Sequence, residues 1–133
     1  MDNGGVIPPP VGKTDVTVDD LGTYDATGDD FNFILDFSSA TQIFAANING
    51  FDTGDIVTIT NAPANADIGT LYGSSSATSI DFFYGNTTLF MPSWTVQFGD
   101  QDAAVVTDLV NGATVDDQQA TLDAAWGDWL FIA

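Results

Sequence analysis

The side chains in this sequence that could do chemistry are almost all aspartates, and five of them gather in two glycine-containing turns. Asp25, Asp29 and Asp30 lie in the first turn, and Asp52 and Asp55 lie in the second. A hard cation such as Ca²⁺ takes several oxygen ligands, which short Asp-rich loops supply. The pattern therefore predicts a calcium site in these turns, with the alternative that the same residues only form turns and helix caps.

The second turn belongs to the clearest signal in the chain, residues 48–60. Asn49-Gly50 and Thr53-Gly54 give the backbone two places to adopt positive φ without steric cost. The β-branched run at residues 56–60 then predicts a strand with a buried face. Whether or not the aspartates bind metal, this turn sets how the strand joins the sheet.

Gly followed by Asp recurs at four positions, each directly before a predicted strand or helix: Gly28-Asp29, Gly54-Asp55, Gly99-Asp100 and Gly127-Asp128. Turns and helix caps select the same pair without any metal. Only the clustering of further aspartates around two of the pairs favours a cation. The sequence has no EF-hand loop, because the spaced aspartates and distal Glu of that motif are missing.

The composition indicates that the aspartates serve specific positions in turns or cation loops and are not only a source of surface charge. All 19 acidic residues are Asp, and against a single Lys they give a formal net charge of −18. A surface acidified only for solubility would use Glu as readily. Since so much like charge destabilises the compact state, a bound divalent cation would stabilise the fold. We therefore expect stability to depend on Ca²⁺.

The same composition excludes several classes of function. Phosphate backbones bind through positive charge, which Lys13 alone does not supply, so we expect no nucleic-acid partner. Without His, Cys, Arg or Glu the chain lacks most catalytic groups. The adjacent pairs Asp29-Asp30 and Asp116-Asp117 do not match a glycosidase pair set across a cleft, so we expect no enzyme. No apolar run approaches the roughly 20 residues that span a bilayer, so we expect no membrane insertion.

The elements that would position these residues are mostly strands. Residues 1–14, with three consecutive prolines, are predicted to be an extended arm or linker, or an arm that adds a strand to a neighbouring subunit. Residues 15–133 are predicted to form one β-rich domain. Alternation and turn signals predict a loop at 61–79 and strands at 15–18, 31–37, 41–48, 55–60, 80–84, 89–91, 94–98 and 128–133.

Helical spacing begins after Gly99. Residues 102–110 and 114–126 are predicted helices, the second capped by Thr114 and ended by Gly127. Together these elements predict a mainly β fold, a single-domain antiparallel β-sandwich with one or two short helices near the C-terminus.

Several of these segments, taken in order, resemble a known family. FNFILDF at 31–37, NINGFDTGDIVTIT at 47–60, WTVQF at 94–98 and GDQDAAVV at 99–106 look like the β-rich domains near the C-termini of RTX-type and related type I secreted bacterial proteins. The resemblance implies an extracellular or cell-surface protein, exported without a cleaved N-terminal signal into surroundings rich in Ca²⁺. The glycine-rich nonapeptide of RTX β-rolls is absent.

We therefore expect an extracellular structural or adhesive protein, a filament, matrix or surface-layer subunit. It would self-assemble into a homo-oligomer or polymer, be stabilised by calcium, and be joined through its arm. The alternative is a glycan-binding module in which exposed aromatic rings stack on sugars. Its candidate rings are Tyr72, Tyr84, Trp94, Trp126 and Trp129, of which Trp94 lies in an alternating strand and is expected in the core.

Overall fold

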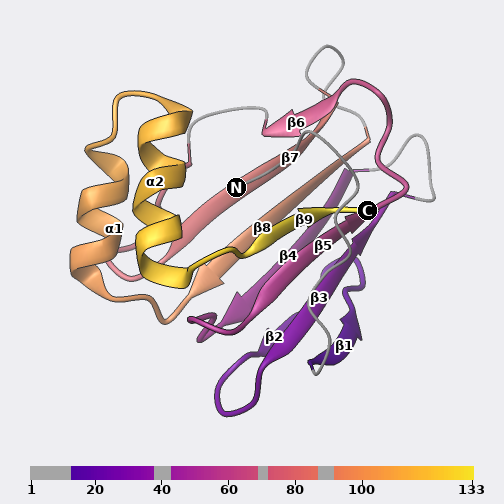
Figure 1. The fold of residues 1–133 in the computed structure, drawn as a ribbon, viewed down its shortest axis with the longest axis horizontal. Coiled ribbons are helices and arrows are strands. Elements are labelled where there is room, and N and C mark those ends of the chain that lie inside the picture. The colour runs from indigo at the N-terminus through magenta and orange to yellow at the C-terminus, as the bar shows by residue number, and fades with distance from the viewer. Residues whose placement is uncertain (1–12, 38–42, 69–71, 87–91) are drawn as a thin grey trace.

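Two β-sheets lie face to face in the computed structural model, which describes residues 13–37, 43–68, 72–86 and 92–133 (Figure 1). Sheet A is parallel throughout, in the strand order β1 (Thr14–Thr17), β3 (Phe31–Asp36), β5 (Ile56–Thr60) and β9 (Leu130–Ile132). Sheet B is mixed, in the order β2 (Thr23–Asp25), β4 (Ile43–Asn49), β8 (Ser93–Gly99), β7 (Ile80–Asn86) and β6 (Ala66–Ile68).

The chain alternates between the two sheets and so builds successive coils. β1, β3 and β5 belong to sheet A, whereas β2 and β4, which come between them in the sequence, belong to sheet B. Each return to sheet A brings the chain back in the same direction, so neighbouring strands of sheet A are parallel. Only β7 runs antiparallel to both of its neighbours, β8 and β6.

The prediction of a mainly β fold is confirmed, and the prediction of an antiparallel sandwich is wrong. An antiparallel sandwich would have the Gly-containing turns before Phe31 and Ile56 join hydrogen-bonded neighbours. They instead carry the chain from sheet B to sheet A, and the hydrogen-bonded neighbour of β3 is β5, one full coil later. A turn signal marks where the chain reverses, but it does not say which sheet receives the next strand.

The core lies between the sheets and is dominated by aromatic rings. Phe51, in the turn after β4, is buried, and its ring lies 4.7 Å from that of Trp126 and 5.0 Å from that of Phe98. Trp94 is buried as predicted, and its indole nitrogen donates to the carbonyl of Asp36 at 3.1 Å. The two layers are therefore joined both by packing and by a hydrogen bond across them.

Two helices close one end of the layers, on the left of Figure 1: α1 (Ala103–Val110) and α2 (Val115–Trp126). Both helix predictions are confirmed, with Asp102 capping α1, and Thr114 capping α2 by accepting from the N–H of Asp117. Gln118 is buried on α2, and its amide bonds the backbone of Tyr72 and the carbonyl of Leu109. None of the described helices is long and apolar enough to cross a membrane.

Most of the predicted strands are confirmed with ends shifted by a residue or two, whereas the short strand β2 was not predicted and three other predictions have different outcomes. The segment 61–79, predicted to be a loop, contains the three-residue strand β6, whose short alternation around an exposed Asp67 gave no clear signal. The predicted strand at 89–91 and nearly all of the predicted arm at 1–14 lie outside the described residues.

Candidate functional site

The passages from sheet B to sheet A all lie at one end of the layers and stack on one another. Residues 26–30 join β2 to β3, residues 50–55 join β4 to β5, and residues 100–129, which include both helices, join β8 to β9. The N–H of Ala26 donates to the carbonyl of Asn49 at 2.7 Å, and the N–H of Gly50 donates to that of Gly99 at 3.1 Å. These three segments, called here the turn end, hold four of the five predicted calcium ligands. The fifth, Asp25, is the last residue of β2.

Three of the four Gly-Asp pairs mark equivalent points on successive coils. Gly28, Gly54 and Gly127 have φ of 96°, 105° and 75°, which favour glycine. At Gly54 a side chain would also collide with its neighbour, since a Cβ there would lie 2.5 Å from Oδ1 of Asp30. The recurring pair is thus a structural mark of each return to sheet A.

Asp55 is fully buried and ties two coils together. Its Oδ1 accepts from the N–H of Phe31 at 2.9 Å, and its Oδ2 accepts from the N–H of Asp52 at 3.0 Å. Burial raises the pKa of Asp55 to about 6. The two backbone hydrogen bonds lower this pKa and the nearby Asp52 carboxylate raises it, but burial is the largest effect. Both carboxylate oxygens are engaged with the backbone, which gives Asp55 a structural role in the turn.

The other four predicted ligands are exposed. Asp25 closes a local turn, because its Oδ1 accepts from the N–H of Thr27 at 3.0 Å and from its hydroxyl at 2.7 Å, and these bonds lower its pKa. Asp29, Asp30 and Asp52 are exposed in the stacked turns. Across the described ranges, no group of three or more acidic side chains is placed to hold a metal ion. The calcium site therefore stays a prediction. The two turns are adjacent, but their carboxylates do not form a group of three within the described ranges.

A hollow of about 450 Å³ beside these turns brings the predicted ligand Asp52 together with residues that were not predicted as ligands. Asp52, Asp100 and Asp102 contribute to its lining. Gln101 lies between the last two, and its side chain is buried: Nε2 donates to the carbonyl of Phe51 at 3.0 Å, and Oε1 accepts from the indole of Trp126 at 3.2 Å. The pair Gly99-Asp100 was the signal that could have added Asp100 to the site.

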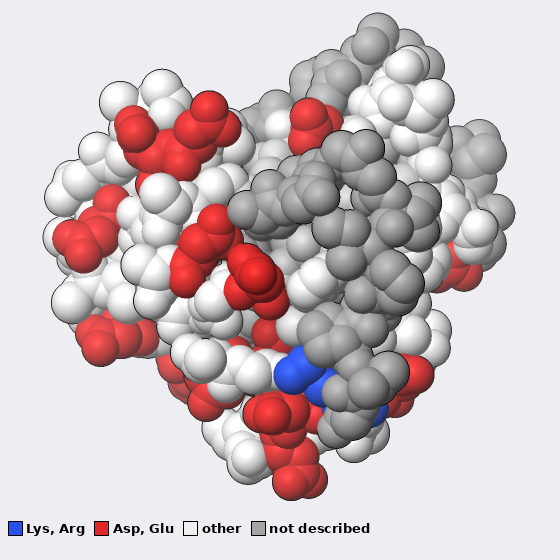
Figure 2. All heavy atoms as spheres, in the orientation of Figure 1, with Lys and Arg blue, Asp and Glu red and all other residues white. Residues whose placement is uncertain are grey.

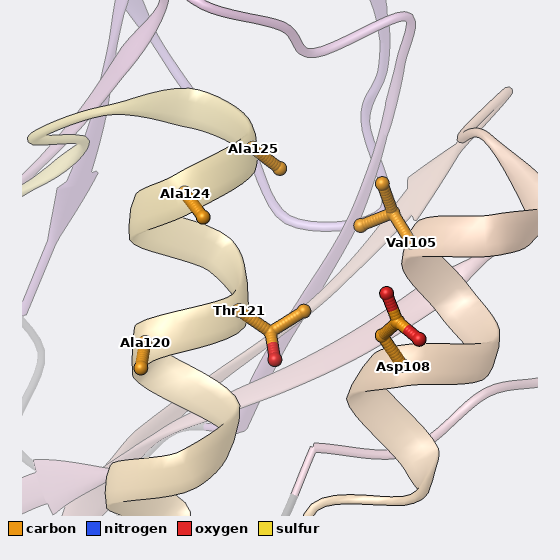
Figure 3. A pocket seen from close by; sticks show the side chains of 6 residues that line it. All are labelled: Val105, Asp108, Ala120, Thr121, Ala124 and Ala125. Carbon is orange, nitrogen blue, oxygen red and sulfur yellow. The ribbon is translucent and has the colours of Figure 1, made fainter.

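A second hollow of about 450 Å³ lies between the helices (Figure 3). Val105 and Asp108 face it from α1, and α2 contributes Thr121 with three alanines, Ala120, Ala124 and Ala125. One carboxylate and one hydroxyl among small aliphatic groups provide neither a base with a nucleophile nor a set of metal ligands. This hollow therefore adds no chemistry.

The aromatic rings proposed for glycan stacking are all in the core. Tyr72, Tyr84, Trp94, Trp126 and Trp129 are each no more than 6% exposed. A ring that stacks on a sugar needs one free face, and none of these five offers one. Glycan binding through these rings therefore has no structural support.

Carboxylates dominate the charge on the face drawn in Figure 2, both over the helices and over the two shorter turns beside them. The single Lys lies among the carboxylates near these turns. The Nζ of Lys13 donates to the carbonyl of Gly54. Comparisons with protein families, with curated proteins and with solved structures found no match to this chain. The resemblance to RTX-related proteins stays a hypothesis.

Proposed function

We propose that the protein is an extracellular structural or adhesive subunit that polymerises with copies of itself and is stabilised by calcium. One observation carries the proposal: in each sheet, the first and last strands run in the same direction. This holds for β1 and β9 because sheet A is parallel throughout. It holds for β2 and β6 because two successive antiparallel pairings, β8 with β7 and β7 with β6, restore the original direction.

Edge strands of equal direction favour head-to-tail addition. β1 and β2 end one side of the stacked coils, β9 and β6 the other, and Figure 1 places β1 and β2 well away from β6. A strand edge is a template for pairing with another chain. Contacts between two different surfaces of the same molecule generate rings or open filaments rather than closed dimers, which suits a filament, matrix or surface-layer subunit.

Calcium is part of the proposal because the chain carries a large negative charge and exposed carboxylates. The net charge of −18 opposes close approach of two copies, and the exposed Asp25, Asp29, Asp30 and Asp52 present oxygen ligands of the kind that Ca²⁺ prefers. Asp55 supports these turns from inside by bonding the backbone of Phe31 and Asp52. Dependence on Ca²⁺ fits an extracellular location, where the ion is abundant.

Electron microscopy of the purified protein, with millimolar Ca²⁺ and with excess chelator, tests the proposal. We expect regular fibres or sheets with Ca²⁺ and separate particles with chelator. Magnesium at equal ionic strength is the control, because it screens charge without offering the larger, flexible coordination of Ca²⁺. A protein that stays monomeric at high concentration in Ca²⁺ would refute the proposed self-assembly.

A further inference from the structure

The two edges of sheet A match each other in their side chains. A column of core-facing residues begins at Val16 on β1 and ends at Leu130 on β9, passing through Phe33 and Val57. Val16 and Leu130 therefore stand at opposite ends of one column. Consider a strand beside β9 that runs in the direction of β1 and points the same alternate side chains toward the core. It would continue this apolar column without turning a polar side chain inward.

The edges also match in their backbone hydrogen-bonding groups. On β1 the N–H groups of Thr14 and Val18 donate into the sheet, to Asp30 and Ile34 at 3.1 and 3.0 Å. Because alternate residues of a strand direct their backbone groups to opposite sides, Thr17 directs its N–H and carbonyl outward. On β9 the N–H of Ala133 donates to Ile59 at 2.8 Å, so Ile132 likewise directs its backbone groups away from β5.

β9 lacks the devices that usually protect an edge strand. Lys, Pro and inward-pointing charges are the common protections, yet β9 consists of Leu130, Phe131 and Ile132, the last two half-buried. β1 at the opposite edge carries exposed polar side chains around Val16. Because β1 and β9 run in the same direction and continue one column of core-facing residues, a further copy can add its β1 to β9 as the next parallel strand of the sheet.

We propose that β9 of one copy pairs in parallel with β1 of the next, with Leu130 opposite Val16, Phe131 opposite Thr17 and Ile132 opposite Val18. The N–H of Thr17 then donates to the carbonyl of Leu130, and the N–H of Ile132 donates to the carbonyl of Thr17. This inference rests on the proposed self-assembly and names its contact, the β9–β1 junction, with a second copy of this chain as partner.

A proline at the outward amide of β1 tests the junction. Thr17 is exposed and its N–H points away from β3, so Thr17→Pro removes a junction donor without breaking a bond inside the molecule, and edge strands tolerate Pro at such positions. Thr17→Ala, which keeps the N–H, is the matched control. We expect fibres from the parent and from Thr17→Ala in Ca²⁺, and at least a tenfold loss of polymer from Thr17→Pro at unchanged melting temperature.

Two failures are distinguishable in that experiment. Fibres formed equally well by a folded Thr17→Pro would overturn the β9–β1 junction and leave the proposed function standing. A parent protein that never polymerises would overturn both.

Disulfide trapping tests the register directly, since the chain has no Cys. Thr17 and Phe131 share a row of sheet A with Ile34 and Thr58 between them. Within one copy they are three strand spacings apart, about 14 Å, too far for a disulfide, whereas across the junction they are neighbours. The variant carrying Thr17→Cys and Phe131→Cys should form a ladder of covalent multimers on a non-reducing gel.

A double variant carrying Leu21→Cys and Phe131→Cys is the control, because Leu21 is 79% exposed and lies outside the edge strands. It should give little cross-linking. Covalent dimers formed as readily by Phe131→Cys alone would indicate that β9 pairs with β9, and would overturn the head-to-tail arrangement.

Discussion

The buried carboxylate of Asp55 accepts the backbone N–H of Phe31, the residue that begins β3 one coil earlier. The same carboxylate accepts the N–H of Asp52 within its own turn. One side chain thus fixes the shape of its turn and the spacing between two stacked coils.

Replacing Asp55 should therefore destabilise the fold more than replacing an exposed neighbour. In Asp55→Asn one of the two backbone donors would face an amide NH₂ in place of an acceptor, and we expect a loss of about 1–3 kcal/mol in the free energy of unfolding at pH 5. Asp29→Asn, at an exposed position of the preceding turn, should change it by less than about 0.5 kcal/mol. Urea denaturation measures both. Equal losses would contradict the role assigned to Asp55.

Stability should also decrease as pH rises through the raised pKa of Asp55. Burial moves this pKa from its ordinary value of 3.8 to about 6, so the folded state holds a proton that the unfolded chain has released. That contribution is complete below about pH 4 and is lost as pH rises past 6. Urea denaturation from pH 4 to 7 should show a steeper decline for the parent than for Asp55→Asn. Parallel curves would show that the other carboxylates cause the decline.

Replacing Gly54 should cost more stability than replacing Gly28, the equivalent glycine of the preceding coil. Gly54→Ala places a side chain at a φ of 105° and a Cβ 2.5 Å from Oδ1 of Asp30, whereas Gly28→Ala meets a φ of 96° with no atom within 4 Å. Positive φ costs an L-residue about 1–2 kcal/mol, so both variants should lose that much, and Gly54→Ala more. Thermal denaturation compares them, and adding Asp30→Ala should recover the difference. No recovery would contradict the collision.

The local elements of this fold could be predicted from the sequence, and their pairing could not. The β-branched run at 56–60 and the caps at Thr114 and Gly127 depend on residues close in the chain, and all are found as predicted. The pairing of Val57 with Leu130 joins residues far apart in the sequence. It depends on how apolar columns line up between coils, which a turn signal does not encode.

The candidate site divides in the same way. The sequence placed Asp25, Asp29, Asp30, Asp52 and Asp55 in turns, and the structure does so for all of them except Asp25, which is the last residue of β2. It did not predict that Asp55 points inward, because the donor that orients it, the N–H of Phe31, belongs to another coil. Nor did it single out Asp100, which joins the hollow only through the fold.

Gln118 should contribute more to stability than its neighbour Gln119. The amide of Gln118 accepts from the N–H of Tyr72 at 2.7 Å and donates to the carbonyls of Tyr72 and Leu109 at 3.1 Å each. Gln118→Leu would remove both side-chain bonds to the backbone of Tyr72, whereas the carbonyl of Leu109 keeps the N–H of Gly112, and we expect a loss of about 1–3 kcal/mol. Gln119→Leu is the control, because the buried Oε1 of Gln119 has no hydrogen-bond partner in the described structure. Urea denaturation should separate the two variants, and similar losses would contradict the bridging role.

Calcium should raise the melting temperature through the exposed aspartates of the turn end. A ligand at 100 times its dissociation constant stabilises the folded state by about 2.7 kcal/mol, which corresponds to a shift of several degrees for a chain of this size. We expect that shift between millimolar Ca²⁺ and excess chelator at low ionic strength, and a smaller one with Mg²⁺.

Two doubly substituted variants of equal charge show where the ion acts. The pair Asp29→Asn and Asp30→Asn changes exposed carboxylates of the stacked turns, whereas the pair Asp116→Asn and Asp117→Asn changes the first turn of α2. The calcium-dependent shift in melting temperature should fall by more than half in the first variant and persist in the second, because general charge screening would affect both alike. Equal shifts in both variants would remove Asp29 and Asp30 from the calcium site, and no shift in the parent protein would refute calcium stabilisation itself.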